Sequence, residues 1–343
     1  MTSNKPFDAV LVIAFGGPEK PSDIEPFLKN VLRGKRVPPN RIREVAHHYE
    51  KFGGYSPITE LTRRQANGLA HRLTESGLQL PVYVGMRNWH PFLADTLREM
   101  SNQGIRRAIG FIAAPHRGYS SCTQYRENVM AARQQLYKHG LPDIKITYVD
   151  DWHDHKGFIV ANSEGIRRAI NKLPPSTQKS AKILFTAHSV PKKMAGAETY
   201  SRQIQTTAKL IANHLERTDW AVVYQSRSGH PSDPWLEPDI CEYLSIENKR
   251  GLQAAVISPI GFVCDHVEVL YDLDHKAAAV CEKTGLPMTR AHTVNDHPKF
   301  LDMMTSVVKT TYDRYATGQP IEILPNNVQI STRQYQTVYS KQR

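Results

Sequence analysis

Short apolar runs alternate with longer amphipathic stretches along most of the 343-residue chain. A continuous apolar run favours a strand buried on both faces, and an amphipathic stretch between two such runs is typical of a helix that covers a parallel sheet. The expected strands are 9–15, 82–86, 108–114, 144–148, 183–187, 221–225 and 254–258. The expected helices are 61–73, 92–100, 122–137, 156–171, 200–215, 265–283 and 298–315. This pattern fits two doubly wound α/β units better than one.

The division into domains follows from where the strands fall. The third expected strand ends near Ala114, and a new series begins after it. We therefore expect an N-terminal domain at 6–115 and a second domain at 116–297. The last helix, at about 298–316, has no strand after it, so we expect it to pack back on the first domain. Residues 317–343 form a polar tail.

The basic composition restricts the partners that the chain suits. Lysine and arginine number 44 against 33 acidic residues, which gives a net charge of +11. Such an excess suits nucleic acid, a membrane surface or a polyanionic small molecule, or is simply a solvated basic surface. The sequence contains no DNA- or RNA-binding signature. A nucleic-acid-binding function would therefore depend on charge alone.

The four cysteines lie far apart, with no Cys-x-x-Cys pair. This spacing argues against a structural zinc or iron–sulfur site and is typical of a protein of the reducing cytoplasm. No apolar run approaches the roughly 20 residues that a membrane-spanning helix needs. We therefore expect a cytoplasmic protein without an integral membrane segment.

His188 is the first candidate for chemistry. In open α/β sheets, ligands bind beyond the carboxyl ends of the strands. His188, in the sequence FTAHSVP, directly follows the strand expected at 183–187. A neutral imidazole held there can bind a divalent metal or accept a proton. A lone histidine is more often structural, but its place at a strand end favours a site.

A second candidate lies in the stretch FVCDHVEVLYDLD, residues 262–274. If a helix begins near Asp265, then Glu268, Asp272 and His275 follow one another at i, i+4 and i+7 along one stripe. Two aligned carboxylates can guide a cation or transfer protons, and their repulsion raises the pKa of one of them. Alternatively, the stripe is an exposed face whose acids favour the positive end of the helix. The residues alone leave both interpretations open.

Two further segments carry functional signals. The stretch YQSRSGHPSDPWLEPDI, residues 224–240, predicts a long loop anchored by Trp235, and loops of this length are often functional. The segment 33–57 begins with the basic cluster Arg33-Gly34-Lys35-Arg36 and continues with tyrosine, histidine and serine. Arginines near aromatic and hydroxyl groups suit a flat ligand that carries carboxylates.

Together these motifs resemble the ferrochelatase family, whose members insert ferrous iron into a porphyrin. The segments VLVIAFGGP, GGYSPI, VYVGMRNWHPF, TAHSVP, YQSRSGHPSDPWLEPDI and PIGFVCDHVEVLYDLD occur in the family's order, and the resemblance covers about residues 7–312. It implies the chelatase fold, with two similar Rossmann-like doubly wound domains, parallel sheets and a porphyrin cleft between them. It also implies a lyase of haem and porphyrin biosynthesis.

The resemblance assigns roles to individual residues. The family's metal-site histidine falls on His188 and its glutamate on Glu268, so both would bind the metal and act in catalysis. The acidic trail of the family continues onto Asp272 as a third catalytic residue. Lys276 stands where many relatives carry another acid, which argues against an outer metal site along this helix.

The short and basic segment 33–57 is similar to the coproporphyrin branch of the family, whose substrate has four propionates. On this resemblance, the residues that contact the propionates or the macrocycle edge are Arg33, Tyr49, Ser56 and Tyr125. Two residues depart from that branch. Phe15 stands beside the porphyrin where many coproporphyrin enzymes have a tyrosine, and His48 stands where some have an arginine.

The resulting hypothesis is a ferrochelatase that inserts Fe²⁺, the substrate metal, into coproporphyrin III to give coproheme. The alternatives are a protoporphyrin IX ferrochelatase giving protohaem, a cobalt chelatase of the same fold, and a non-catalytic porphyrin or haem carrier. No cysteine follows Cys281, so we expect no iron–sulfur cluster. The expected partner is the small-molecule porphyrin and not a nucleic acid. We expect a monomer that has transient contacts with neighbouring enzymes of the haem pathway.

Overall fold

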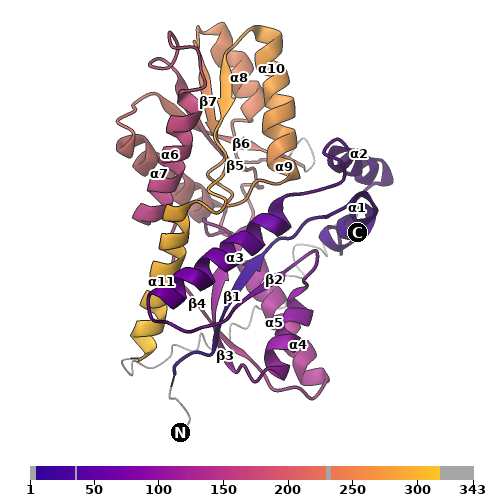
Figure 1. The fold of residues 1–343 in the computed structure, drawn as a ribbon. Helices are drawn as coiled ribbons and strands as arrows, with labels where there is room; N and C mark the ends of the chain where they lie inside the picture. Colours follow the sequence, from indigo (N-terminus) through magenta and orange to yellow (C-terminus); the bar gives the residue numbers. More distant parts are fainter. Residues whose placement is uncertain (1–4, 35–36, 229–232, 317–343) are drawn as a thin grey trace.

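Two parallel four-stranded sheets, each covered by helices on both faces, build the molecule (Figure 1). The structure is a computed structural model that describes residues 5–34, 37–228 and 233–316. The strand order is β2-β1-β3-β4 in the first sheet and β6-β5-β7-β8 in the second, and all the strand pairs are parallel. This arrangement confirms the predicted α/β class with two doubly wound domains.

The first sheet owes its burial to apolar strands that face helices on both sides. Its strands are β1 (Ala9–Ala14), β2 (Val82–Met86), β3 (Arg107–Ile112) and β4 (Lys145–Tyr148). All six residues of β1 are buried. Its flanking helices are α3 (Ile58–Glu75), α4 (Leu93–Asn102), α5 (Gln124–Lys138) and α11 (Pro298–Ala316). One apolar core joins the sheet to α3 and α11, and another joins the opposite face to α4 and α5.

The second sheet repeats this layering. Its strands are β5 (Lys182–His188), β6 (Trp220–Gln225), β7 (Ala255–Ser258) and β8 (Met288–Arg290). Its helices are α6 (Lys156–Ile170), α7 (Ala197–His214), α8 (Ile240–Lys249), α9 (Val267–Val269) and α10 (Ala278–Thr284). Helices α6 and α7 cover one face, and α8 and α10 cover the other. β5 lies in the interior of the sheet, between β6 and β7.

The structure corrects the predicted domain boundary near residue 115. β4 pairs with β3 from Arg107–Lys145 to Gly110–Tyr148, so the first sheet extends to Tyr148. The reason is the β–α–β connection through α5, which returns the chain beside β3. The spacing of apolar runs cannot show which sheet a strand joins. Helix α11 packs against α3 and the first sheet, and also contacts α6. The tail at 317–343 lies outside the described residues.

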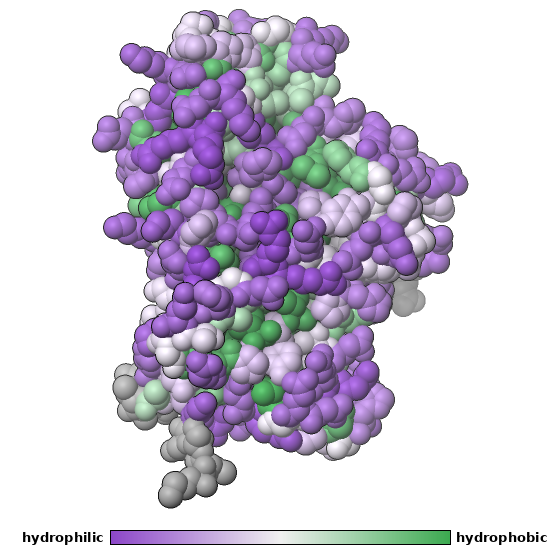
Figure 2. Space-filling view, in the orientation of Figure 1, coloured by the Kyte–Doolittle hydropathy of each residue, from purple (hydrophilic) through white to green (hydrophobic). Residues whose placement is uncertain are grey.

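Two short helices project from the first domain toward the second. They are α1 (Ile24–Val31), which follows the single 3₁₀ turn η1 (Pro21–Asp23), and α2 (Pro39–Glu50), which contacts α9 (Figure 1). The face shown in Figure 2 is mostly hydrophilic, with apolar side chains gathered in smaller patches. Among the described helices, none combines the length and the apolar character that crossing a membrane requires.

Candidate active site

His188 and Glu268 face each other at the carboxyl edge of the second sheet. His188 is the last residue of β5, and Glu268 lies in α9, the single turn that follows β7. The Nε2 atom of His188 is 3.9 Å from Oε2 of Glu268. The two side chains keep 35% and 38% of their surface exposed, so both remain accessible. The structure thus brings together the two residues that the sequence singled out.

Backbone contacts fix the His188 ring in one tautomer. Nδ1 lies within hydrogen-bonding distance of the carbonyl oxygen of Ser189. Because a carbonyl oxygen only accepts, Nδ1 carries the proton, and the lone pair of Nε2 is free on the side of Glu268. The hydroxyl of Tyr200 donates to the carbonyl oxygen of His188 at 3.3 Å. The ring is therefore ready to bind a cation or take up a proton through Nε2.

The loop that contains Trp235 supports the segment after His188. Trp235 is buried and forms an isolated bridge with Pro191. The Ser189 hydroxyl donates to the carbonyl of Leu236 at 2.8 Å, and the Leu236 amide donates to Val190 at 2.9 Å. The described part of the loop is therefore packed against the strand end that carries the imidazole. Residues 229–232 of this loop lie outside the described part of the chain.

The acidic stripe does not lie on an ordinary α-helix, contrary to the prediction for 265–283. After α9 the chain forms the π-helical segment η3 (Leu270–Ala277) and only then α10. A π-helix has i→i+5 hydrogen bonds and wider turns, so the α-helical i, i+4, i+7 alignment does not hold. Apolar periodicity gave no signal for this widening. π-Helical turns occur frequently at functional sites.

Asp272 is buried and already has partners. Lys276 Nζ is 3.2 Å from its Oδ1, and the Ser226 hydroxyl donates to its Oδ2. The ammonium stabilises the charged carboxylate, so Asp272 is not a free ligand beside Glu268. His275 lies further out, with Nε2 3.0 Å from Lys51 Nζ.

Aromatic residues of the first domain lie near Glu268. Tyr49 is buried and packs against Phe27, with ring centroids 5.5 Å apart. Burial, and then the negative charge of Glu268, raise the pKa of the Tyr49 hydroxyl. Phe15, which follows β1, also packs against Phe27, with ring centroids 6.3 Å apart. Tyr49 therefore keeps its proton and is a neutral donor close to the carboxylate.

Arg87 is a functional candidate to which the sequence assigned no role. Its guanidinium carbon lies 4.6 Å from the Tyr125 ring centroid and 5.8 Å from that of Phe15. Nε donates to Oδ1 of Asn128 at 2.5 Å. Tyr125 is buried, which raises the pKa of its hydroxyl, while Arg87 opposes that shift. The available signal was the place of Arg87 directly after β2, at the carboxyl edge of the first sheet.

Arg33 and Ser56, the other two residues predicted to contact the porphyrin, differ in their exposure to solvent. Arg33 is exposed and donates to Asn30 at 2.6 Å, while Asn30 donates to the carbonyl of Asn88 at 3.1 Å. Ser56 is only 2% exposed. It lies against Gly17, where an added Cβ would come within 2.9 Å of its hydroxyl oxygen. Ser56 therefore packs against Gly17 and leaves almost no surface that a ligand could contact.

The described residues include no group of three or more His, Cys, Asp or Glu side chains placed to hold a metal ion. His188 and Glu268 place one imidazole nitrogen and one carboxylate 3.9 Å apart. Imidazole and carboxylate suit Fe²⁺ and also accept Zn²⁺ or Co²⁺. Such a pair fits a metal that is held briefly and passed on.

Comparison with known proteins gives matches over most of the chain. The family model described as Ferrochelatase matches residues 7–312. A Rhodopirellula baltica protein named Ferrochelatase is 43% identical over 310 residues, which cover 90% of this chain and 87% of that protein. The Coproporphyrin III ferrochelatase of Streptomyces coelicolor is 44% identical over 318 residues, covering 88% and 85% of the two chains.

Solved structures support the fold. The sirohydrochlorin chelatase SirB from Bacillus subtilis subspecies spizizenii, in complex with cobalt, superposes with a TM-score of 0.54 at 11% identity. The match covers 91% of this chain and 98% of that one. At 11% identity, this superposition shows that the two folds are similar and nothing more.

Proposed function

The chain belongs to the ferrochelatase family, and from that premise we propose that it inserts Fe²⁺ into coproporphyrin III to give coproheme in haem biosynthesis. The observation that carries the proposal is the separation of 3.9 Å between His188 Nε2 and Glu268 Oε2. An imidazole lone pair and a carboxylate at this distance can share one incoming cation. They can also accept the protons that the porphyrin must lose.

The proposed chemistry follows from what insertion requires. Two pyrrole N–H protons must leave the macrocycle, and the iron must exchange its water ligands for nitrogens. We assign the first contact with Fe²⁺ and the uptake of pyrrole protons to His188 and Glu268. Asp272, held by Lys276 and the Ser226 hydroxyl, would stabilise positive charge that moves from Glu268 toward solvent.

The choice of coproporphyrin III is supported by charge and by relatives. Arg33 donates to Asn30, which in turn donates to the backbone of Asn88, the residue after Arg87. Guanidinium groups pair well with carboxylates. Four propionates offer more such pairs than the two of protoporphyrin IX. The relative named Coproporphyrin III ferrochelatase is 44% identical to this chain, and the relative named only Ferrochelatase is 43% identical.

We further propose that the protein works in the cytoplasm as a monomer. The four cysteines are free thiols, as is usual in a reducing compartment. Any contact with enzymes before or after it in haem synthesis would be transient.

An anaerobic insertion assay tests the proposal. Purified protein is mixed with Fe²⁺ and either coproporphyrin III or protoporphyrin IX, and the loss of the free-base absorption bands is followed. We expect fast insertion into coproporphyrin III. Preference for protoporphyrin IX would move the protein to the other branch of the family. Tight porphyrin binding without insertion would favour a carrier.

A further inference from the structure

Arg290 connects two carboxylates that flank Glu268 in the sequence. It is the last residue of β8, and its side chain is only 7% exposed. Its Nε and Nη2 atoms donate to the two oxygens of Asp274 at 2.6 and 2.8 Å. Its Nη1 atom donates to Oδ1 of Asp265 at 2.9 Å. One guanidinium therefore ties the chain before α9 to the π-helical segment after it.

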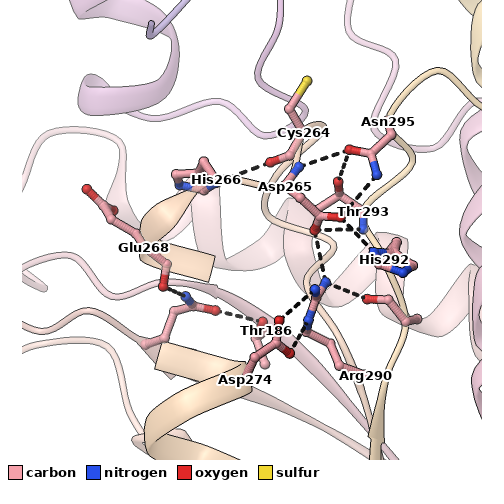
Figure 3. A network of polar contacts seen from close by, with 12 residues as sticks. Thr186, Cys264, Asp265, His266, Glu268, Asp274, Arg290, His292, Thr293 and Asn295 are labelled. Carbon is pink, nitrogen blue, oxygen red and sulfur yellow. Dashed lines mark hydrogen bonds and ion pairs between the residues drawn. The ribbon is translucent and has the colours of Figure 1, made fainter. Parts of the chain in front are cut away.

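Further contacts fix the Asp265 end of this connection (Figure 3). The other carboxylate oxygen of Asp265 receives hydrogen bonds from His292 Nδ1 at 2.8 Å and from Asn295 Nδ2 at 3.1 Å. The Asp265 amide donates to Oδ1 of Asn295 at 2.9 Å. These donors and the positive charge of Arg290 hold the pKa of Asp265 well below its usual range, although burial opposes them.

Glu268 itself stays outside this network. In Figure 3 its side chain points away from Arg290, and its backbone carbonyl accepts a long hydrogen bond of 3.5 Å from Gln225. The network therefore fixes the backbone on both sides of Glu268 without neutralising its carboxylate. π-Helical turns are rare and are mostly short interruptions of α-helices, so contacts from outside the segment help to fix the course of η3.

We propose that Arg290 is a positioning residue for Glu268. By holding Asp265 and Asp274 together, it keeps the Glu268 carboxylate at the distance from His188 that a shared cation needs. The inference rests on the proposed function. The planar fork of arginine is required, because lysine offers a single point charge that cannot pair with both oxygens of Asp274 and reach Asp265 as well.

The test compares Arg290→Lys with a matched control. Arg133→Lys breaks the same kind of fork, between Arg133 and Asp143 at 2.9 and 2.6 Å, on α5 of the first domain. Zn²⁺ binding to the porphyrin-free protein is measured by calorimetry. The His188→Ala variant is titrated in parallel, and only the Zn²⁺ binding that this variant lacks is assigned to the site. Loss of a partner that orients a metal ligand costs about 10- to 100-fold in metal affinity. We expect such a loss in Arg290→Lys and none in Arg133→Lys.

A double-mutant cycle separates positioning from general loss of structure. In a Glu268→Gln background, Arg290→Lys should weaken Zn²⁺ binding no further, because the positioned carboxylate is already gone. The proposal would be overturned if Arg290→Lys lowered the Zn²⁺ affinity equally in the wild-type and Glu268→Gln backgrounds. It would also be overturned if Arg290→Lys alone left the Zn²⁺ affinity unchanged. If Arg290→Lys does not fold, Asp274→Asn, which leaves Asp265 and Arg290 in place, is used in the same cycle.

The two proposals fail in different ways. With iron and porphyrin, Arg290→Lys should lower kcat by about the same factor as the Zn²⁺ affinity, and leave the KM for porphyrin within about twofold. A wild-type protein that inserts no metal into any porphyrin would refute the proposed function. The Zn²⁺ cycle would still decide whether Arg290 positions Glu268.

Discussion

His48 of α2 and Tyr271 of η3 stack face to face between the two domains, with ring centroids 3.5 Å apart and planes 17° apart. Lys276 Nζ lies 4.9 Å from the centroid of the same tyrosine ring. Lys51 of the segment after α2 reaches His275 of η3. Helix α2 is thus fastened to the segment that carries Asp272 and follows Glu268.

This stack should weaken in acid. Burial, and then the nearby charge of Lys276, lower the pKa of His48 from 6.5 to about 4. Since the folded pKa lies below the unfolded one, the stability from neutral His48 is complete above pH 6.5 and is lost as the pH falls toward 4. His48→Phe keeps a ring that cannot charge. Thermal unfolding at pH 7 and pH 5 should show a smaller drop in Tm for His48→Phe than for the wild type; equal drops would contradict this assignment.

Arg87 should contribute to porphyrin affinity through its charge. Replacement by methionine keeps an apolar chain between Phe15 and Tyr125 but removes the guanidinium. Hydrogen bonds to charged groups contribute about 1.5–3 kcal/mol, so coproporphyrin III should bind roughly 10- to 100-fold more weakly. Quenching of protein fluorescence during a porphyrin titration measures this. Arg98→Met, which removes an exposed partner of Asp95 on α4, is the control and should bind normally.

Trp235 should be a large contributor to stability. It is buried and holds the loop that packs on the segment after His188. Trp235→Ala should lower the free energy of unfolding by about 3–5 kcal/mol, as large aromatic-to-alanine changes in cores do. Urea unfolding measures the loss. A change below about 1 kcal/mol would mean that the loop is not anchored there, since surface substitutions have effects of about this size or less.

The candidate metal site should accept more than one cation. An imidazole and a carboxylate do not discriminate strongly among divalent first-row metals, so Zn²⁺ and Co²⁺ should also be inserted in vitro. Parallel assays with each metal and one porphyrin test this. Strict selectivity for Fe²⁺ would require ligands beyond His188 and Glu268.

The sequence predicted the strands well because continuous apolar runs are a local signal. Placement of those strands is a long-range property, so 144–148 was assigned to the wrong domain. β8, Met288–Arg290, has three residues and gave no periodic signal. Its short length also concealed Arg290, whose partners Asp265 and Asp274 are distant in the sequence.

In the candidate site, too, local signals were readable from the sequence and long-range contacts were not. His188 was predicted from its place at a strand end, and Glu268 from the acidic stretch and the order of the motifs; the structure places the two side chains 3.9 Å apart. The widening of the helix at η3 and the His48–Tyr271 stack depend on packing between domains, which spacing alone does not encode. The resemblance assigned Ser56 to the ligand, and the motif that it rests on gives no information about the burial of this side chain.

The most direct test of the roles proposed for His188 and Glu268 replaces them with alanine and glutamine in separate proteins. Coproporphyrin III binding is measured by fluorescence quenching, and Fe²⁺ insertion by the loss of free-base absorption under anaerobic conditions. Both variants should bind the porphyrin like the wild type, while insertion falls by about 100-fold or more, in the range of lost acid–base and metal-ligand groups. Insertion at the wild-type rate by either variant, with porphyrin binding intact, would contradict these roles.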